Sequence, residues 1–496
     1  MSATRLVAVA AAIAAGVALA GNQAVVAGGL GQAAPQKTQA VVIKGRAPVS
    51  TELLKITLPR PAEADLSNGA HLMVLEDRRV PQVTLQILIP GAGGYYDPAD
   101  VPGLASFTAA MMREGTPTRT TSQISEQLET MAASVGVGAG VSGRDATVSA
   151  SSLTENFDAT LSLLADILLH PTFPEEEFAR YKERTRSSFI QQRTNPGFLA
   201  TELFSRAVYG SHPAARITPT SGALDKATRT MLADFHRAKY VPDHAVIAVA
   251  GDISLADARK LVDAKLAGWK KSGAAAPTVV DAEPIGPAQV SLIARPNSVQ
   301  TSLYVGTQAI SRTSPDYDVV SVMNQVIGGG PTGRLFIHLR EEKGYTYGAY
   351  SGVSANIWRG TWLASMDVRT DVTGPALRDL MAEIAQMRDE AVPEKEFLDK
   401  RRAMIASFAL SLESAQAVLS NYITSWTYHL PADYWDKYPE RIMAVTQAQV
   451  QAAAKKYLDA GRLQIIAVGD GTKIGELLKT FGPVETYDTN GKKIGG

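Results

Sequence analysis

The chain repeats itself once, and this repeat limits its folds more than any other feature. Three segments recur at nearly one offset. The pairs, separated by 218, 219 and 218 residues, are Gln82 with Gln300, Phe173–Phe178 with Val392–Phe397, and Val249–Asp252 with Ala467–Asp470. Since a shared offset indicates duplication of a whole folding unit, we predict two tandem domains of similar fold.

The repeat also predicts where the domains begin and end. We place the first domain at 51–272, the second at 287–482 and a short tail at 483–496. The connection at 273–286 is small, polar and marked by proline, as is typical of linkers.

Each half mixes two hydrophobic periods. Alternating or short apolar runs predict strands at 83–90, 146–152 and 244–250, and again at 302–307, 348–353, 360–369 and 463–468. Amphipathic runs predict helices at 121–133, 156–169, 175–192, 375–390 and 394–412. The pattern is typical of an α+β fold, in which each domain is a mainly antiparallel sheet flanked by helices packed on one face.

The N-terminus resembles an export signal. Arg5 precedes an apolar run from Leu6 to Ala20, and Ala18-Leu19-Ala20 fits a cleavage site. We predict a signal peptide at 1–20, a flexible leader at 21–50, and a periplasmic or extracellular protein without stable membrane insertion after cleavage. An uncleaved anchor is the alternative.

Composition excludes several classes of protein. The chain has 49 basic and 49 acidic residues, so no net charge attracts nucleic acid. It has no cysteine, which excludes disulfides, thiolate metal sites and thiol nucleophiles. It has no Gly-x-Ser-x-Gly motif, so a serine hydrolase is not predicted.

The segment Gly103–Thr116 resembles a zinc-binding helix without its ligands. The resemblance is to the pitrilysin and mitochondrial-processing-peptidase family, the inverted-motif zinc peptidases, whose helix carries His-x-x-Glu-His. At the positions of the first histidine, the glutamate and the second histidine, this chain has Ser106, Ala109 and Ala110. The family's fold, called metalloenzyme LuxS/pitrilysin-like, agrees with the α+β prediction.

The third ligand of the family, a glutamate further along the chain, aligns with Ser188. Zinc needs about three protein ligands supplied by imidazole, thiolate or carboxylate groups. A serine and two alanines supply none of these, and no two of the chain's seven histidines stand at metal-binding spacing. We therefore predict no metal and no cofactor in this chain.

A second signature of the family lies in the second half, where Arg340 is followed seven residues later by Tyr347. Locally, Leu335, Phe336 and Leu339 predict an apolar helical face that ends at Gly344. Arg340 and Tyr347 should then project from a helix end and the next strand.

By resemblance, Arg340 and Tyr347 hold a substrate carbonyl and stabilise the oxyanion, opposite the zinc. The alternative is an exposed Arg340 paired with a nearby acid and a Tyr347 buried in the sheet.

Two glycine-rich segments have weaker functional interpretations. Gly328, Gly329 and Gly330 match the family's substrate-side loop, but the segment equally fits a turn that leads into the helix. It lacks the Gly-Lys-Ser/Thr ending of a phosphate loop. In the second segment, Gly136–Gly140, Ala139 stands where active relatives have an asparagine on an edge strand. An edge strand binds an extended peptide through its main chain, so the loss of the asparagine does not exclude peptide binding.

Some members of the family are heterodimers in which one chain holds zinc and the other holds the arginine and tyrosine. The resemblance therefore implies a non-catalytic, substrate-binding subunit of an exported zinc endopeptidase acting on peptides. Its partner would be a homologous subunit that carries the zinc. The alternative is a peptide-binding or assembly module without a catalytic partner, and a divergent enzyme with another site is a third possibility.

Overall fold

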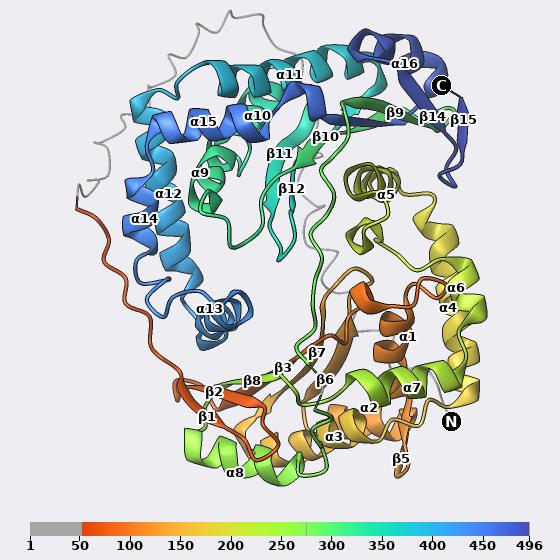
Figure 1. The fold of residues 1–496 in the computed structure, drawn as a ribbon, viewed down its shortest axis with the longest axis vertical. Helices are drawn as coiled ribbons and strands as arrows, with labels where there is room; N and C mark the ends of the chain where they lie inside the picture. The colour runs from red at the N-terminus through yellow and green to blue at the C-terminus, as the bar shows by residue number, and fades with distance from the viewer. Residues whose placement is uncertain (1–51, 274, 496) are drawn as a thin grey trace, which may run out of the picture. The chain divides into compact units, whose positions relative to one another are not determined.

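The structure is a computed structural model and describes residues 52–273 and 275–495. The predicted signal peptide and leader lie outside the described residues. Two large β-sheets organise the described chain, one built from each half of the sequence (Figure 1).

The first sheet is made entirely from the first half. Within the described residues it has six strands, in the order β1 (Ala62–Asp65), β2 (His71–Glu76), β8 (Val246–Gly251), β3 (Gln82–Pro90), β7 (Asp145–Leu153) and β6 (Ser134–Ala139). All neighbours are antiparallel except β2 and β8, which run parallel. β6 therefore lies at one edge.

Starting from the opposite edge, the second sheet repeats this order over its first five strands. Its strands in the described chain are β11 (Thr346–Ser354), β12 (Thr361–Arg369), β10 (Gln300–Gln308), β13 (Gln464–Gly469), β9 (Gln289–Ala294), β14 (Val484–Tyr487) and β15 (Lys493–Gly495). β9 runs parallel to both β13 and β14, and the other pairs are antiparallel. The segment predicted as a tail thus extends the sheet.

In each half, most helices pack on one face of the sheet from the same half or on the helices that cover this face. In the first half they are α1 (Leu104–Met111), α2 (Thr121–Thr130), α3 (Phe157–Leu169), α4 (Glu175–Gln192), α6 (Ser221–Lys226), α7 (Arg229–Lys239) and α8 (Leu255–Lys265). In the second half they are α9 (Tyr317–Ile327), α10 (Arg334–Phe336), α11 (Thr373–Asp389), α12 (Glu394–Ser411), α14 (Tyr438–Ala444), α15 (Gln447–Tyr457) and α16 (Gly471–Leu478).

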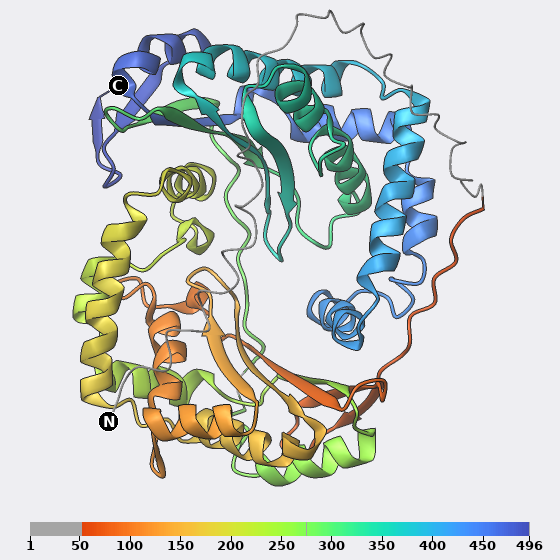
Figure 2. The same ribbon diagram turned by 180° about the vertical axis from the view of Figure 1, so that it is seen from behind.

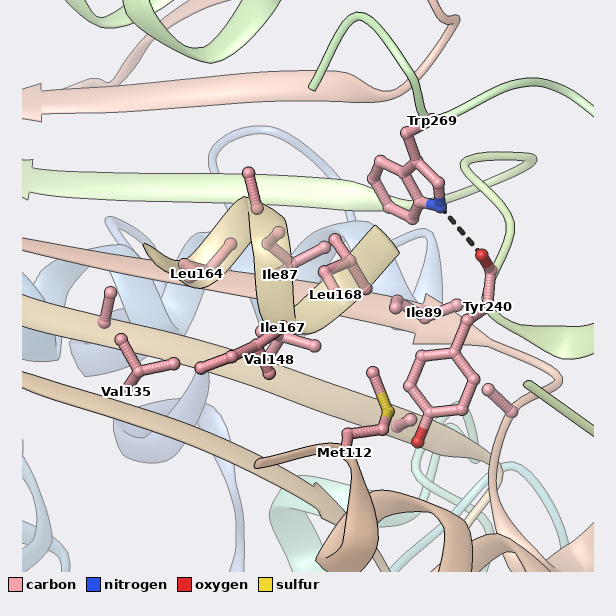
Figure 3. Close-up of a cluster of buried hydrophobic side chains, with 14 of the residues drawn as sticks. Ile87, Ile89, Met112, Val135, Val148, Leu164, Ile167, Leu168, Tyr240 and Trp269 are labelled. Atoms are coloured by element: carbon pink, nitrogen blue, oxygen red, sulfur yellow. Dashed lines mark hydrogen bonds between the residues drawn. The ribbon is translucent and has the colours of Figure 1, made fainter. Parts of the chain in front are cut away.

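The core of the first half forms between its sheet and α3 (Figure 3). Ile87 of β3, Val148 of β7 and Leu164 of α3 are all fully buried there. At one end of the cluster the indole of Trp269 donates a 2.8 Å hydrogen bond to the carbonyl of Tyr240. These contacts follow from the alternation of apolar residues along β3 and β7, which turns one side of each strand inward.

Two further helices cover the opposite sheets (Figures 1 and 2). α5 (Pro196–Tyr209), from the first half, packs on the second sheet through Leu203 and Phe204. α13 (Ala415–Tyr428), from the second half, packs on the first sheet through Val418 and Leu419.

The prediction that helices cover only one face was therefore wrong. Because both faces of the central strands are covered, β8 and β13 are buried at all six positions and show no alternation of polar residues. The α+β fold with two related sheets is confirmed.

The predicted linker is packed against both halves. The amide of Val280 donates to the Tyr95 hydroxyl at 2.9 Å, and the Asp281 carboxylate pairs with Arg359 at 2.8 Å.

Within the described part of the chain, no single helix is long and apolar enough to cross a membrane. α12 and α13 meet that length and composition only as a pair, and they are bent by 112°.

Candidate functional site

The helix that resembles the zinc-binding segment, α1, is short and deeply packed. It begins after Gly103, which has a φ of +109°, and a side chain added there would stand 2.6 Å from Pro219. The carboxylate of Asp97 accepts hydrogen bonds from the amides of Gly103 (2.6 Å) and Ala105 (2.9 Å). Asp97 thus serves as the acceptor at the helix N-terminus, a role that the sequence analysis missed.

Asp97 is only 8% exposed. Burial raises the pKa of Asp97 to about 6, while the hydrogen bonds from Ala105 and Gly103 oppose this rise. Because this value exceeds the usual 3.8 of an unfolded aspartate, the folded protein holds the proton more tightly.

The stabilisation that this proton provides is complete below about pH 4 and is lost as the pH rises through about 6. We expect the difference in unfolding free energy between the wild type and Asp97→Asn to fall by on the order of 2 kcal/mol from pH 4 to pH 7. Urea unfolding at several pH values measures this difference. A difference that grows with pH would mean that the amide hydrogen bonds lower the pKa of Asp97 more than burial raises it.

The positions aligned with zinc ligands carry no ligand. Ser106 and Ala110 are half-buried on α1, and Ala109 is 2% exposed. Ser188 lies on the exposed side of α4, which contacts α1 through the rings of Phe107 and Tyr181, 6.1 Å apart.

The acid nearest to Ser188 in sequence is already engaged. Glu183 forms an ion pair with Arg186, which also binds Asp225 at 2.7 Å. Among residues 52–273 and 275–495, no three His, Cys, Asp or Glu side chains are grouped to hold a metal ion. The side chains at the aligned positions thus do not fit zinc.

The segment that carries Arg340 is helical, as predicted, but its second part is wider than an α-helix. After α10, residues Ile337–Glu342 form a π-helix, η5. The amide of Lys343 donates to the carbonyl of His338, five residues back, at 3.0 Å. Gly344 then ends the turn with a φ of +63°, the left-handed conformation that its identity predicted.

Tyr347 lies on β11, at the edge of the second sheet. The pairing of β11 with β12 shifts register between Thr346 and Ala349, and the Thr346 hydroxyl accepts a 3.1 Å hydrogen bond from the amide of Gly348. Tyr347 falls in this bulge, and 91% of it is exposed. The alternative expectation, a Tyr347 buried in the sheet, is wrong.

Arg340 and Tyr347 lie together. The guanidinium carbon of Arg340 is 5.4 Å from the ring centre of Tyr347 and 4.8 Å from that of Phe336. Arg340 also forms an ion pair with Glu341, as the alternative expectation held. The structure therefore places the cation of Arg340 beside the exposed phenol of Tyr347. Two such groups can together hold a carbonyl oxygen.

The glycine-rich loop connects α9 to α10 and is fastened to β11. The amide of Ser351 donates to the carbonyl of Gly328 at 2.8 Å, and a side chain at Gly328 would stand 2.6 Å from that amide nitrogen. A side chain at Gly330 would meet nothing within 4 Å. Gly328 thus has a structural reason to be glycine, and the loop serves at least as the turn that leads into the helix.

Ala139 ends β6, which pairs only with β7 and leaves one edge of the first sheet unpaired among the described strands. The position is half-buried. β6 and β11 occupy equivalent edges of the two sheets. Such an edge offers main-chain donors and acceptors to an extended peptide whatever its side chains.

Comparison with known proteins points to one family. A model described as Insulinase (Peptidase family M16) matches residues 72–220, and one described as Peptidase M16 inactive domain matches 226–404. An uncharacterized zinc protease of Bacillus subtilis, YmxG, is 26% identical over 71% of this chain and 85% of its own length. A second such protease, from Rickettsia felis, is 25% identical over 74% and 89%.

Solved structures agree with this result. The crystal structure of a peptidase M16 inactive domain from Pseudomonas fluorescens is 29% identical, with a TM-score of 0.75, and covers 83% of this chain and 98% of that one. A protease from Helicobacter pylori has a TM-score of 0.76 at 15% identity, covering 83% and 100%. At that identity the second match shows the fold alone.

Proposed function

Because this chain belongs to the peptidase M16, or pitrilysin, family and lacks its zinc motif, we propose that it is the non-catalytic, substrate-binding subunit of a two-chain zinc endopeptidase. In this proposal the protein is exported, to the periplasm or outside the cell. A homologous partner holds the zinc, and the two chains together cleave peptides.

The contact between Arg340 and Tyr347 carries the proposal. The guanidinium carbon of Arg340 lies 5.4 Å from the ring centre of Tyr347, and the exposure of Tyr347 leaves its side chain open to a substrate. Since arginine stays charged and a phenol donates near neutral pH, both can stabilise the oxyanion that forms when water attacks a peptide bond. No step of that attack is assigned to α1 of this chain, which offers neither a metal ligand nor a base at the aligned positions.

The proposal is tested by reconstitution. The purified chain should bind no stoichiometric zinc and cleave no peptide, whereas a mixture with a homologue that bears His-x-x-Glu-His should cleave an unstructured fluorogenic peptide. The partner alone, at the same zinc content, is the control. Zinc bound at one equivalent by this chain alone, or cleavage by the partner that this chain does not increase, would contradict the proposal.

A second candidate is a peptide-binding or assembly module without a catalytic partner, which the unpaired edge of β6 supports. Binding of an extended peptide to this chain alone, together with the absence of a zinc-bearing relative in the same genome, would favour it. Replacing Val137, at the centre of β6, with proline should weaken such binding because proline removes a main-chain donor and distorts the edge.

A further inference from the structure

The segment that presents Arg340 is held on the side facing α11 by a half-buried histidine and a buried carboxylate. We propose that His338 is a positioning residue for Arg340 and that Glu383 of α11 is its anchor. The inference rests on the proposed function, because Arg340 would perform the task that His338 supports.

The contact is short and largely hidden from solvent. His338 Nδ1 lies 2.7 Å from Glu383 Oε1, and Glu383 is 9% exposed. Among the described residues, the other oxygen of Glu383, Oε2, has no hydrogen-bond partner. Since a buried carboxylate is costly unless it is paired, the bond to His338 and the nearby charge of Arg334 both help to stabilise Glu383 in this position.

The second nitrogen of His338 faces another acid. Nε2 lies 3.9 Å from Asp379, which stands one turn before Glu383 on α11. The two ring nitrogens therefore point to two different carboxylates, and the imidazole bridges them. We call this arrangement the clamp; among the described residues no three His, Cys, Asp or Glu side chains are grouped to hold a metal ion.

The contact between His338 and Glu383 affects Arg340 through the backbone of the π-turn. The carbonyl of His338 accepts the hydrogen bond from Lys343 that defines the π-turn, and the amide of Tyr345 donates to Leu339 at 3.0 Å. Residues two apart on a helix do not share a face. Anchoring His338 to α11 therefore turns Arg340 away from α11, toward the ring of Tyr347.

A separate ion pair holds the start of the same segment. Both Nε and Nη2 of Arg334 donate to the Glu396 carboxylate, at 2.9 and 2.8 Å. This pair precedes the π-turn and would hold α10 even without His338. The loss of His338 should therefore loosen the π-turn without releasing the whole segment.

Hydrogen exchange on the isolated chain tests the positional part of the inference. In His338→Ala the amides of Lys343 and Tyr345 should exchange about tenfold faster, while those in β12 stay unchanged. Glu383→Gln keeps an acceptor oxygen and should show a smaller increase than Glu383→Ala. His170→Ala, at an exposed histidine of the first half, is the matched control. Unchanged exchange at Lys343 and Tyr345 would overturn the inference.

A double-mutant cycle in the reconstituted two-chain enzyme tests the link to Arg340. His338→Ala should lower kcat/KM about 10- to 100-fold at unchanged zinc content, but it should change little when added to Arg340→Ala. Equal effects in both backgrounds would overturn the positioning role. If Arg340→Ala itself had no effect, the proposed function would fail, and the exchange experiment would still decide whether His338 holds the turn.

Discussion

Replacing Arg340 with alanine in the proposed two-chain enzyme is expected to lower kcat about 100- to 1000-fold and to change KM far less. Removal of one oxyanion donor has a cost of this size, since the donor acts most strongly on charge that develops in the transition state. The measurement is steady-state cleavage of a fluorogenic peptide by the mixture, with zinc content and assembly checked by metal analysis and gel filtration.

Three further variants sharpen the result. Arg340→Lys keeps the charge but loses the planar guanidinium, and it should recover only part of the activity. Tyr347→Phe removes the phenol alone and should lower kcat by about 10- to 100-fold. Arg237→Ala changes an exposed arginine of the first half, which pairs with Asp234, and should leave activity unchanged. Full activity of Arg340→Ala would disprove the proposed role.

Replacing Arg312 with alanine is expected to lower the free energy of unfolding by about 3 to 5 kcal/mol. Arg312 is 6% exposed. Four rings surround its guanidinium, with centres at 3.9 Å (Tyr317), 5.1 Å (Tyr434), 5.7 Å (Trp435) and 5.9 Å (Tyr428). Its side chain also donates to the Tyr434 hydroxyl at 3.1 Å. Truncation would lose these contacts and leave a cavity between α9 and the loop after α13.

The Arg312 variants separate charge from shape. Arg312→Lys keeps the cation but stacks less well on the rings and should cost about 1 to 2 kcal/mol. Arg312→Met keeps much of the packing and loses the cation, so its stability reports how much the charge contributes. Urea unfolding followed by tryptophan fluorescence measures all three variants. A loss below about 1 kcal/mol for Arg312→Ala would show that the rings close over the vacated space.

Regular local patterns were predictable from the sequence. α4 begins and ends at the predicted residues, Glu175 and Gln192, because its amphipathic pattern starts directly after a proline. β3 and β12 lie within one residue of their predicted bounds, since alternation along a strand covered on one face is a strong signal. The left-handed Gly344 was predictable too, because glycine after an apolar helical face is a common helix end.

Contacts between distant segments were not predictable. Nothing in the sequence of α13 shows that it covers the sheet of the other half, because an apolar helical face does not specify its partner. The π-turn at Ile337–Glu342 has no local signal, and it is held in part by Glu383, 45 residues from His338. Asp97 was missed for a different reason: it lies only six residues before Gly103, but the conformation of the loop between them decides whether it reaches the start of α1.

The sequence by itself determined that this protein is a duplicated α+β chain, that the positions aligned with zinc ligands carry serine and alanine, and that an arginine and a tyrosine stand seven residues apart in the second half. These properties depend on residue type and spacing, which are read directly along the chain. Only the tertiary structure decided that α5 and α13 cover opposite sheets, that Tyr347 is exposed at a bulge and that its ring lies beside Arg340. Those properties depend on which distant surfaces pack together, and packing is decided by the whole fold and not by any one segment.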